Sequence, residues 1–159
     1  SSLTPNLIPY NHQSFGNSEE NNATQLAKIG TEEWVIAGTS GDSDSRIQLV
    51  KIDNSQSEVW NKVIQTEFAT SASSIYPISD GLLIAGTSIN NEGDMSITKT
   101  NLEGEILWAK EYGGFGIDRV GKIIQSSDEG IVFIGTLTFG ENTMISLIKV
   151  DPDGDLNIF

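Results

Sequence analysis

The sequence predicts an all-β protein that is built from three copies of one sheet-forming unit. Each copy contains an apolar run that ends in glycine, a polar loop, a run that carries lysine and a tight turn. The apolar runs are residues 34–38, 82–86 and 131–135, and the lysines are Lys51, Lys99 and Lys149. Equivalent glycines are 48 and 49 residues apart, and equivalent lysines are 48 and 50 residues apart.

Four strand-like runs in each repeat are typical of one blade of a β-propeller. The runs that end in glycine are apolar throughout instead of alternating, which indicates strands that are covered on both faces. Pairs such as Asp80-Gly81 supply the positive φ values that short hairpins need. No sustained 3.6-residue apolar period with capping residues is present, so we expect essentially no helix.

We predict one structural domain with four parts. The parts are a polar lead with an outer closing strand at residues 1–15, and three four-stranded antiparallel blades at residues 16–64, 65–112 and 113–159. The closing strand is inferred from residues 6–15, which align with residues 105–115 when Phe15 is set on Phe115. Pro9 within it suits an edge strand, where its missing N–H is not needed.

An aromatic residue closes each unit, and a further tryptophan begins the first apolar run. Trp60, Trp108 and Phe159 close the three units, and we expect them to pack between outer strands. Trp34 begins an apolar run and is expected in the core. The recurring lysines are interpreted as structural, because a residue repeated in every copy is unlike a site, which breaks the repeat.

Three stretches carry a resemblance to a known family. They are SSDEGIVFIG at 126–135, ISLIKVDPDG at 145–154 and EILWAKEYGG at 105–114. Together they resemble the β-propeller repeats of secreted and cell-surface proteins of bacteria and archaea, over nearly the whole chain from Asn6 onward. The resemblance implies the fold and an extracytoplasmic location, and it implies no particular activity. The tryptophan of the outer strand is similar to that of quinoprotein blades. The alanine-aspartate and threonine-glycine pairs of that pattern are missing, so no quinone cofactor is expected.

Three blades cannot surround a central channel, because propellers use about four to eight. Our leading interpretation is that two copies close a six-bladed ring around a two-fold axis, with the N-terminal strand of one copy completing the last blade of the other. The alternatives are a longer chain that carries further blades, and an open arrangement.

Charge and composition exclude some partners. The chain has 9 basic and 22 acidic residues and a net charge of −13, which disfavours nucleic acid and anionic membrane surfaces as partners. It has no cysteine, so disulfides and thiolate chemistry are excluded. No apolar run approaches the roughly 18 residues that a membrane span requires. An acidic surface of this kind fits an extracytoplasmic protein.

Acidic and aromatic residues gather in the loops that a propeller would place on one rim. The candidate ligand-binding residues are Asp42, Asp44, Glu92, Asp94, Tyr112, Phe115, Asp118, Arg119, Phe139 and Glu141. Aromatic side chains beside carboxylates suit a glycan or protein ligand, and they equally suit plugging a gap between blades. The carboxylates could hold Ca²⁺, but an ordinary hydrophilic rim without a cofactor is the favoured interpretation.

The sequence shows no recognisable arrangement of catalytic residues. His12 has no orienting partner in the sequence, and residues 151–155 depart from the EF-hand template because Leu156 stands at its sixth position. We therefore expect a non-enzymatic binding or assembly platform. The alternative is a glycan-active hydrolase or lyase that uses rim carboxylates, with Asp42, Asp94 and Glu141 as its candidates.

Overall fold

The computed structural model describes residues 13–17, 19–41, 45–68, 70–88 and 93–156. Those residues form eleven β-strands, and none of them lies in a helix, as the sequence predicts. Within the described residues there is therefore no helix of the length and apolar character that crossing a membrane requires.

The strands form three antiparallel sheets, each with its strands in chain order. Sheet 1 contains β1 (Asn21–Ile29), β2 (Glu33–Ser40), β3 (Arg46–Asp53) and β4 (Glu58–Ile64). Sheet 2 contains β5 (Thr70–Ile78), β6 (Gly81–Ser88), β7 (Met95–Asn101) and β8 (Ile106–Tyr112). Sheet 3 contains β9 (Arg119–Gln125), β10 (Ile131–Phe139) and β11 (Asn142–Val150).

The prediction of four strands in every unit is wrong for sheet 3 as described, which has three strands. The equivalent of β4 and β8 would begin near Asp155, and residues 157–159 lie outside the described residues. Along the described chain, β11 therefore has β10 on one side and no strand on the other.

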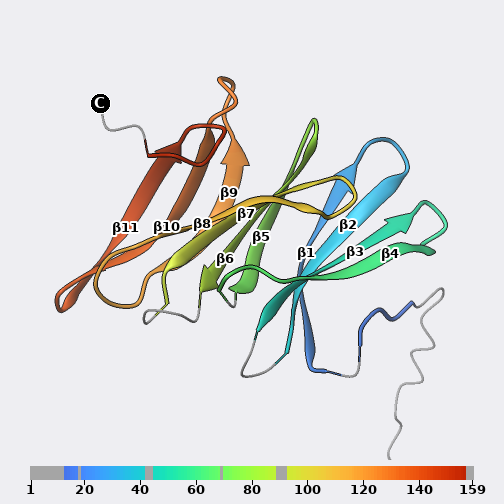
Figure 1. Ribbon diagram of the computed structural model, residues 1–159, viewed down its shortest axis with the longest axis horizontal. Coiled ribbons are helices and arrows are strands. Elements are labelled where there is room, and N and C mark those ends of the chain that lie inside the picture. Colours follow the sequence, from blue (N-terminus) through green and yellow to red (C-terminus); the bar gives the residue numbers. More distant parts are fainter. Residues whose placement is uncertain (1–12, 18, 42–44, 69, 89–92, 157–159) are drawn as a thin grey trace, which may run out of the picture.

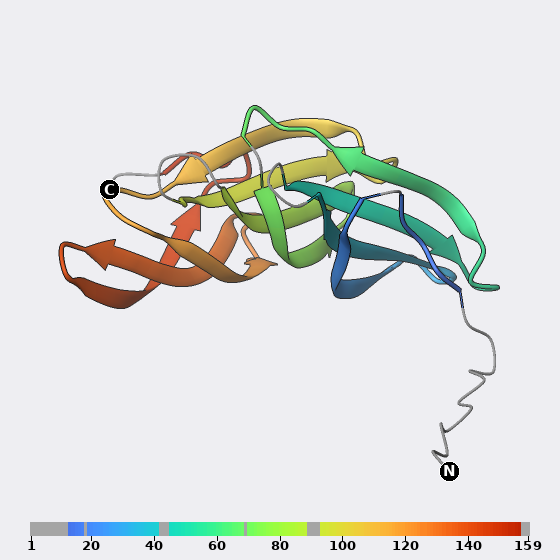
Figure 2. The ribbon, with the colours of Figure 1, turned by 90° about the horizontal axis from the view of Figure 1, so that it is seen from below.

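The sheets follow one another along the longest axis of the molecule (Figure 1). They form an open, arched row and not a closed ring (Figure 2). The first strand of each sheet packs across the preceding sheet, because β5 contacts β1, β2 and β3, and β9 contacts β5, β6 and β7. The first strands also contact one another through Gln25 of β1. Its Nε2 donates a hydrogen bond to the carbonyl oxygen of Ile75 in β5, and its Oε1 accepts one from the Ile75 N–H. Oε1 also accepts a 3.0 Å hydrogen bond from Lys122 of β9.

Two apolar cores fill the two joints between sheets. The first contains Val35, Ala37, Ile47 and Leu49 of sheet 1 against Ile75, Leu82 and Ile84 of sheet 2. The second contains Leu83, Ala85, Met95 and Ile97 of sheet 2 against Val120, Ile123, Ile131 and Phe133 of sheet 3. The central sheet is therefore buried on both faces, which explains why residues 82–86 are apolar at every position.

The glycine that closes each apolar run is required by a bulge in the neighbouring strand. The register of β1, β5 and β9 slips by one residue opposite Gly38, Gly86 and Gly135. A Cβ atom on Gly38 would lie 2.5 Å from the carbonyl oxygen of Asn22, and one on Gly135 would lie 2.5 Å from that of Arg119. Any larger residue there would push the bulged strand away.

The turn that follows the third strand of each sheet has one construction. Asp53, Asn101 and Asp151 each accept hydrogen bonds on Oδ1 from the backbone N–H groups two and four residues later. These bonds identify residues 151–155 as a tight turn equivalent to 53–57 and 101–105. Counted from this turn, Ile158 and not Phe159 stands in register with Trp60 and Trp108; both lie outside the described residues.

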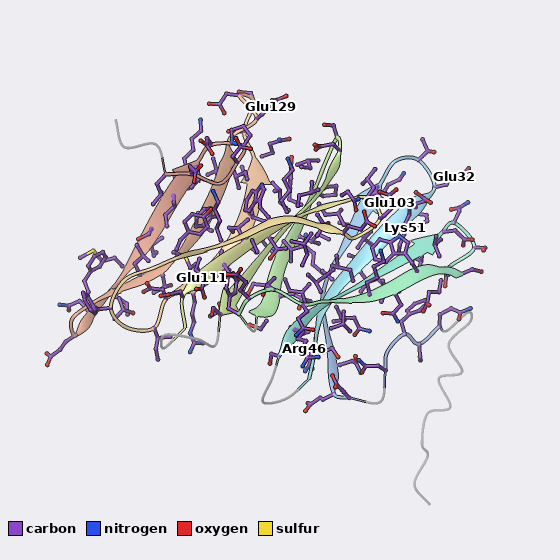
Figure 3. All side chains as sticks on the ribbon, in the orientation of Figure 1. Glu32, Arg46, Lys51, Glu103, Glu111 and Glu129 are labelled. Atoms are coloured by element: carbon purple, nitrogen blue, oxygen red, sulfur yellow. The ribbon has the colours of Figure 1, made fainter. Side chains whose placement is uncertain are left out.

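Each tryptophan near the end of a sheet covers the turn of the next sheet. A Cβ atom on Gly104 would lie 3.1 Å from the Trp60 ring, and one on Gly154 would lie 2.9 Å from the Trp108 ring. The lysine two residues later adds a bond, from Lys62 to the carbonyl oxygen of Glu103 and from Lys110 to the Asp155 carboxylate. In Figure 3, Glu103 accordingly lies beside sheet 1 although it belongs to sheet 2.

The three recurring lysines are structural, as the sequence predicts. Each one forms an ion pair with an acid in, or directly after, the turn between the first two strands of its own sheet. Lys51 pairs with Glu33 at 2.9 Å, Lys99 with Asp80 at 3.7 Å, and Lys149 with Asp128. The Lys149 ammonium, which donates to Asp128, holds the pKa of that carboxyl below its usual range.

Trp34 is half-buried and not in the interior of the core as expected. It lies in β2 one residue before Val35, which faces sheet 2, and adjacent strand residues point to opposite faces. Trp34 therefore faces away from sheet 2, on a face that neither of the other two described sheets covers.

Replacing Gly104 with alanine tests the packing of tryptophan on the turn. Gly104 has φ +75 and the Trp60 ring beside it, whereas Gly30 has φ +61 and nothing within 4 Å of the point that an added Cβ atom would occupy. We expect Gly30→Ala to lower the free energy of unfolding by about 1 kcal/mol, from backbone strain alone, and Gly104→Ala to lower it by about 2–3 kcal/mol. Urea unfolding of both variants measures the difference, and equal losses would show that the ring contact is unimportant.

Candidate functional site

An apolar groove lies between the end of sheet 2 and the face of sheet 3 that is turned toward sheet 2. Its volume is about 530 Å³. The apolar floor comes from Leu137, Ile148 and Leu156, and aromatic side chains stand at Tyr112, Phe115 and Phe139. Glu111, Asp118, Thr138 and the glycines 113, 114 and 140 complete the lining. Four of the ten predicted ligand-binding residues, Tyr112, Phe115, Asp118 and Phe139, therefore share one groove.

Tyr112 is part of the scaffold of this groove. Its hydroxyl donates a 2.7 Å hydrogen bond to the carbonyl oxygen of Gly154, and its ring centroid lies 5.1 Å from that of Phe133. Burial raises the pKa of the Tyr112 hydroxyl above its ordinary value, with smaller contributions from Asp155 and Asp151. The hydroxyl is therefore neutral and already bonded, and the ring is the part that a ligand would contact.

Asp118 organises the loop that leads from sheet 2 to sheet 3. It is 1% exposed. One carboxylate oxygen accepts a hydrogen bond from the Thr138 N–H at 2.7 Å, and the other accepts one from the Gly114 N–H at 3.1 Å. Asp118 thus joins residues 113–118 to β10, and with both oxygens bonded it is poorly suited to acid–base chemistry.

Asp94 and Glu111 lie close to Asp118. Asp94 Oδ1 and Glu111 Oε1 are buried and accept no hydrogen bond from the described residues. Burial raises the pKa of Asp94 above its ordinary value of 3.8, and the charges of Glu111 and Asp118 raise it further. Gly113 makes room for this arrangement, because a Cβ atom there would lie 2.2 Å from Asp94 Oδ1. Figure 3 shows Glu111 near the end of sheet 2, on the side of sheet 3.

The other predicted site residues are dispersed. Asp42, Asp44, Glu92 and His12 lie outside the described residues. Arg119 lines a separate, more polar hollow with Ser71, Thr87 and Ile117. Glu141 is exposed in the turn between β10 and β11, and neither Glu141 nor Asp94 lines the apolar groove. The described part of the chain contains no group of three acidic or histidine side chains arranged to hold a metal ion.

The outer face of sheet 3, which we call the end face, is apolar and uncovered. It is formed by Val132, Ile134, Ile145 and Leu147, which the strand registers place at the positions of Val35, Ala37, Ile47 and Leu49 in sheet 1. The equivalents in sheet 2 are Leu83, Ala85, Met95 and Ile97. All eight residues of sheets 1 and 2 are at most 1% exposed, whereas Ile134, Ile145 and Leu147 are 43%, 92% and 72% exposed.

The opposite end of the row is also apolar. On the face of sheet 1 that points away from sheet 2, which we call the rear face, Leu26 and Ile36 occupy the positions of Ile75 and Ile84 in sheet 2. Ile75 and Ile84 are buried in the first joint, whereas Leu26 is 57% exposed and Ile36 is half-buried. Phe15 and Gln13 lie over part of this face, beside Ile36 and Val50.

Sequence reasoning missed the end face and the floor of the groove. The available signal was the repeat itself, because Ile145 and Leu147 are apolar at positions that are apolar in every copy, and among the described residues no further sheet covers them. Leu137, Ile148 and Leu156 were missed because apolar residues at these positions look like ordinary core residues in the sequence.

No protein-family model matches this sequence, and no curated protein matches it.

Removing the Asp118 carboxylate tests its role in the loop. Asp118→Ala leaves the N–H groups of Gly114 and Thr138 without their acceptor, so we expect the free energy of unfolding to fall by about 2–3 kcal/mol. Asp118→Asn keeps one acceptor and should lose about half as much. Urea unfolding measures both, with the exposed Glu141→Ala as a control that should change stability by less than about 0.5 kcal/mol. A loss in Asp118→Ala no larger than in this control would contradict the assignment.

The raised pKa of Asp94 predicts a pH dependence. Because the folded state holds the Asp94 proton to higher pH than the unfolded state does, the folded state binds more protons in the window that begins near pH 3.8. Stability contributed by Asp94 is therefore present below that window and is lost as the pH rises through it. We expect Asp94→Asn to gain stability relative to the wild type as the pH is raised from 3 to 7, measured by urea unfolding at each pH. A difference that is constant over this range would show that the pKa of Asp94 is not raised.

Proposed function

We propose that this chain is a non-enzymatic, extracytoplasmic assembly module of the β-propeller type. In this proposal the three sheets are half of a six-sheet ring, and a second copy supplies the other half. The observation that carries it is the exposure of the end face, at positions that are fully buried in sheets 1 and 2. The extracytoplasmic location rests on the acidic composition and the resemblance of the repeats.

The repeat indicates what would cover the end face. At both joints within the chain, this set of four residues packs against the first strand and the rear side of the next sheet. Sheet 1 of a second copy presents a rear side of the same kind, with Leu26, Trp34 and Ile36. A head-to-tail contact between copies would thus repeat a joint that the chain already makes twice.

The turn of sheet 1 carries a difference that fits this contact. Gln56, with φ 65, occupies the turn position that corresponds to Gly104 in sheet 2 and Gly154 in sheet 3. Those two glycines lie under the rings of Trp60 and Trp108. Across a head-to-tail joint, the residue in register with these tryptophans would be Ile158. A smaller residue in place of the indole leaves room for a side chain in place of glycine, so the two differences compensate.

Covering the end face would give such a joint a hydrophobic gain that opposes the entropic cost of association. Burying a leucine or isoleucine side chain contributes about 1.5–3 kcal/mol, and the end face offers Ile145 and Leu147 with most of their surface exposed. The joint is heterologous, since it joins two different surfaces, and such contacts give a closed ring when the rotation per copy is right. Two identical joints per dimer double the gain.

The association state of matched variants tests the proposal. Leu147 lies in the end face, whereas Leu107 is a 54% exposed leucine on β8, outside both end surfaces. We expect the wild type and Leu107→Glu to be dimers at micromolar concentration by light scattering, and Leu147→Glu to be a monomer with an unchanged circular dichroism spectrum. A monomeric wild type, or a Leu147→Glu variant that remains dimeric, would refute the proposal.

A further inference from the structure

A polar hollow lies at the second joint, between sheet 2 and the start of sheet 3. Its volume is about 550 Å³, which falls in the range of about 300–1,000 Å³ that is usual for small-molecule sites. Four hydroxyl-bearing residues of sheet 2 and an arginine of β9 line it, namely Ser71, Ser73, Thr87, Ser88 and Arg119. One chain supplies all of these residues, so the hollow does not depend on the head-to-tail joint.

The first joint shows how the repeat fills the equivalent place. There the Thr39 hydroxyl accepts a 3.0 Å hydrogen bond from the Ala72 N–H, and the Thr24 hydroxyl donates one of 3.0 Å to the Ala72 carbonyl oxygen. In the second joint, the strand registers place these three positions at Thr87, Val120 and Ser73. Among the described residues neither bond has a counterpart there, and all three residues line the hollow.

The hydroxyl groups of Ser73 and Thr87 are consequently available to a ligand. Neither hydroxyl forms a hydrogen bond with any other residue in the described ranges. The nearby Ser71 hydroxyl donates only a long bond, of 3.4 Å, to the carbonyl oxygen of Thr87. Because a hydroxyl group can both donate and accept, this lining matches a ligand that carries several hydroxyl groups of its own.

Arg119 supplies the one positive charge among the described lining residues, and none of those residues is acidic. Its side chain is exposed and forms no ion pair with another residue that the structure describes. The planar guanidinium group binds a carboxylate through two parallel hydrogen bonds. An unpaired guanidinium group beside free hydroxyl groups therefore suits a ligand that is both a carboxylate and a polyol.

The backbone before Arg119 is held in place by Asp118. The Asp118 N–H donates a 2.7 Å hydrogen bond to the carbonyl oxygen of Gly93 in the wall of the hollow. The Asp118 carboxylate is engaged by the N–H groups of Gly114 and Thr138 and does not pair with Arg119. The start of β9 is thus fixed to both sheets, which lowers the conformational cost of binding a ligand there.

We propose that this hollow binds an acidic sugar of the hexuronate class. The carboxylate of the sugar lies on the Arg119 guanidinium group, and its hydroxyl groups bond to Ser73 and Thr87. Ile117, which is 51% exposed in the wall, contacts the C–H groups of the sugar ring. The net charge of −13 opposes an anion at long range, but salt screens exposed charges beyond about 8 Å, so the acid-free lining governs binding.

Calorimetric titration of the intact chain with D-glucuronate and D-galacturonate tests the site. We expect at least one of them to bind with a dissociation constant of about 1 mM or below, and Arg119→Met to weaken it by about tenfold or more. Arg119→Lys keeps the charge but loses the two parallel bonds, so its affinity should be intermediate. The matched control is Lys122→Met on the same strand, which removes a charge outside the hollow and should change the affinity by less than about twofold.

Two further titrations separate a sugar site from a simple anion site. D-glucose and inorganic sulfate should each bind at least about tenfold more weakly than the better hexuronate, and Thr87→Val should weaken the hexuronate by about two- to tenfold. Binding of neither hexuronate, or equal losses in Arg119→Met and Lys122→Met, would refute the site. Sulfate or glucose binding as tightly as the hexuronate would overturn the assignment of an acidic sugar. Circular dichroism checks that each variant is folded.

Discussion

The structure depends on one constraint, which is that a sheet with two apolar faces must have a neighbour on each side. Sheet 2 satisfies it within the chain, because the two apolar cores lie on its two faces. Sheets 1 and 3 satisfy it on one face each. Among the described residues this asymmetry leaves apolar surface in water on the end face and the rear face, and the hydrophobic effect favours covering such surface.

The fold was largely predictable because each copy of the repeat contains the residues that form its own local contacts. Each glycine that closes an apolar run faces a bulge, each Asp or Asn at the turn caps the following N–H groups, and each lysine pairs with an acid of its own sheet. All of these contacts join residues of one copy, so a single copy shows them. Contacts between copies were less accessible: Trp60 was expected to pack against outer strands, but it covers the Gly104 turn of the next sheet.

The candidate site was predictable only in part, for the same physical reason. Tyr112, Phe115 and Phe139 interrupt loops that are otherwise small and polar, and Asp118 is one of the acidic residues that a propeller would place on one rim; these features pointed to them. Their roles were not visible, because the hydroxyl of Tyr112 and the carboxylate of Asp118 bond to backbone groups of distant residues, Gly154 and Thr138. A hydrogen bond to a backbone group does not require a particular residue type at the partner position, so the sequence does not reveal it. The residues of the groove floor look like ordinary core residues, and only their unfilled surroundings distinguish them.

The identical construction of the three capped turns has a consequence for how this chain could diverge. All three turns bond backbone N–H groups at two and four residues, and in sheets 2 and 3 a glycine of the turn also lies under an indole ring, so an extra residue would disrupt these contacts. The connections at the other end of the sheets differ in length, since β2 and β3 are separated by five residues, β6 and β7 by six, and β10 and β11 by two. Insertions, and with them new specificities, should therefore accumulate at that end of the sheets while the turn end stays invariant in length.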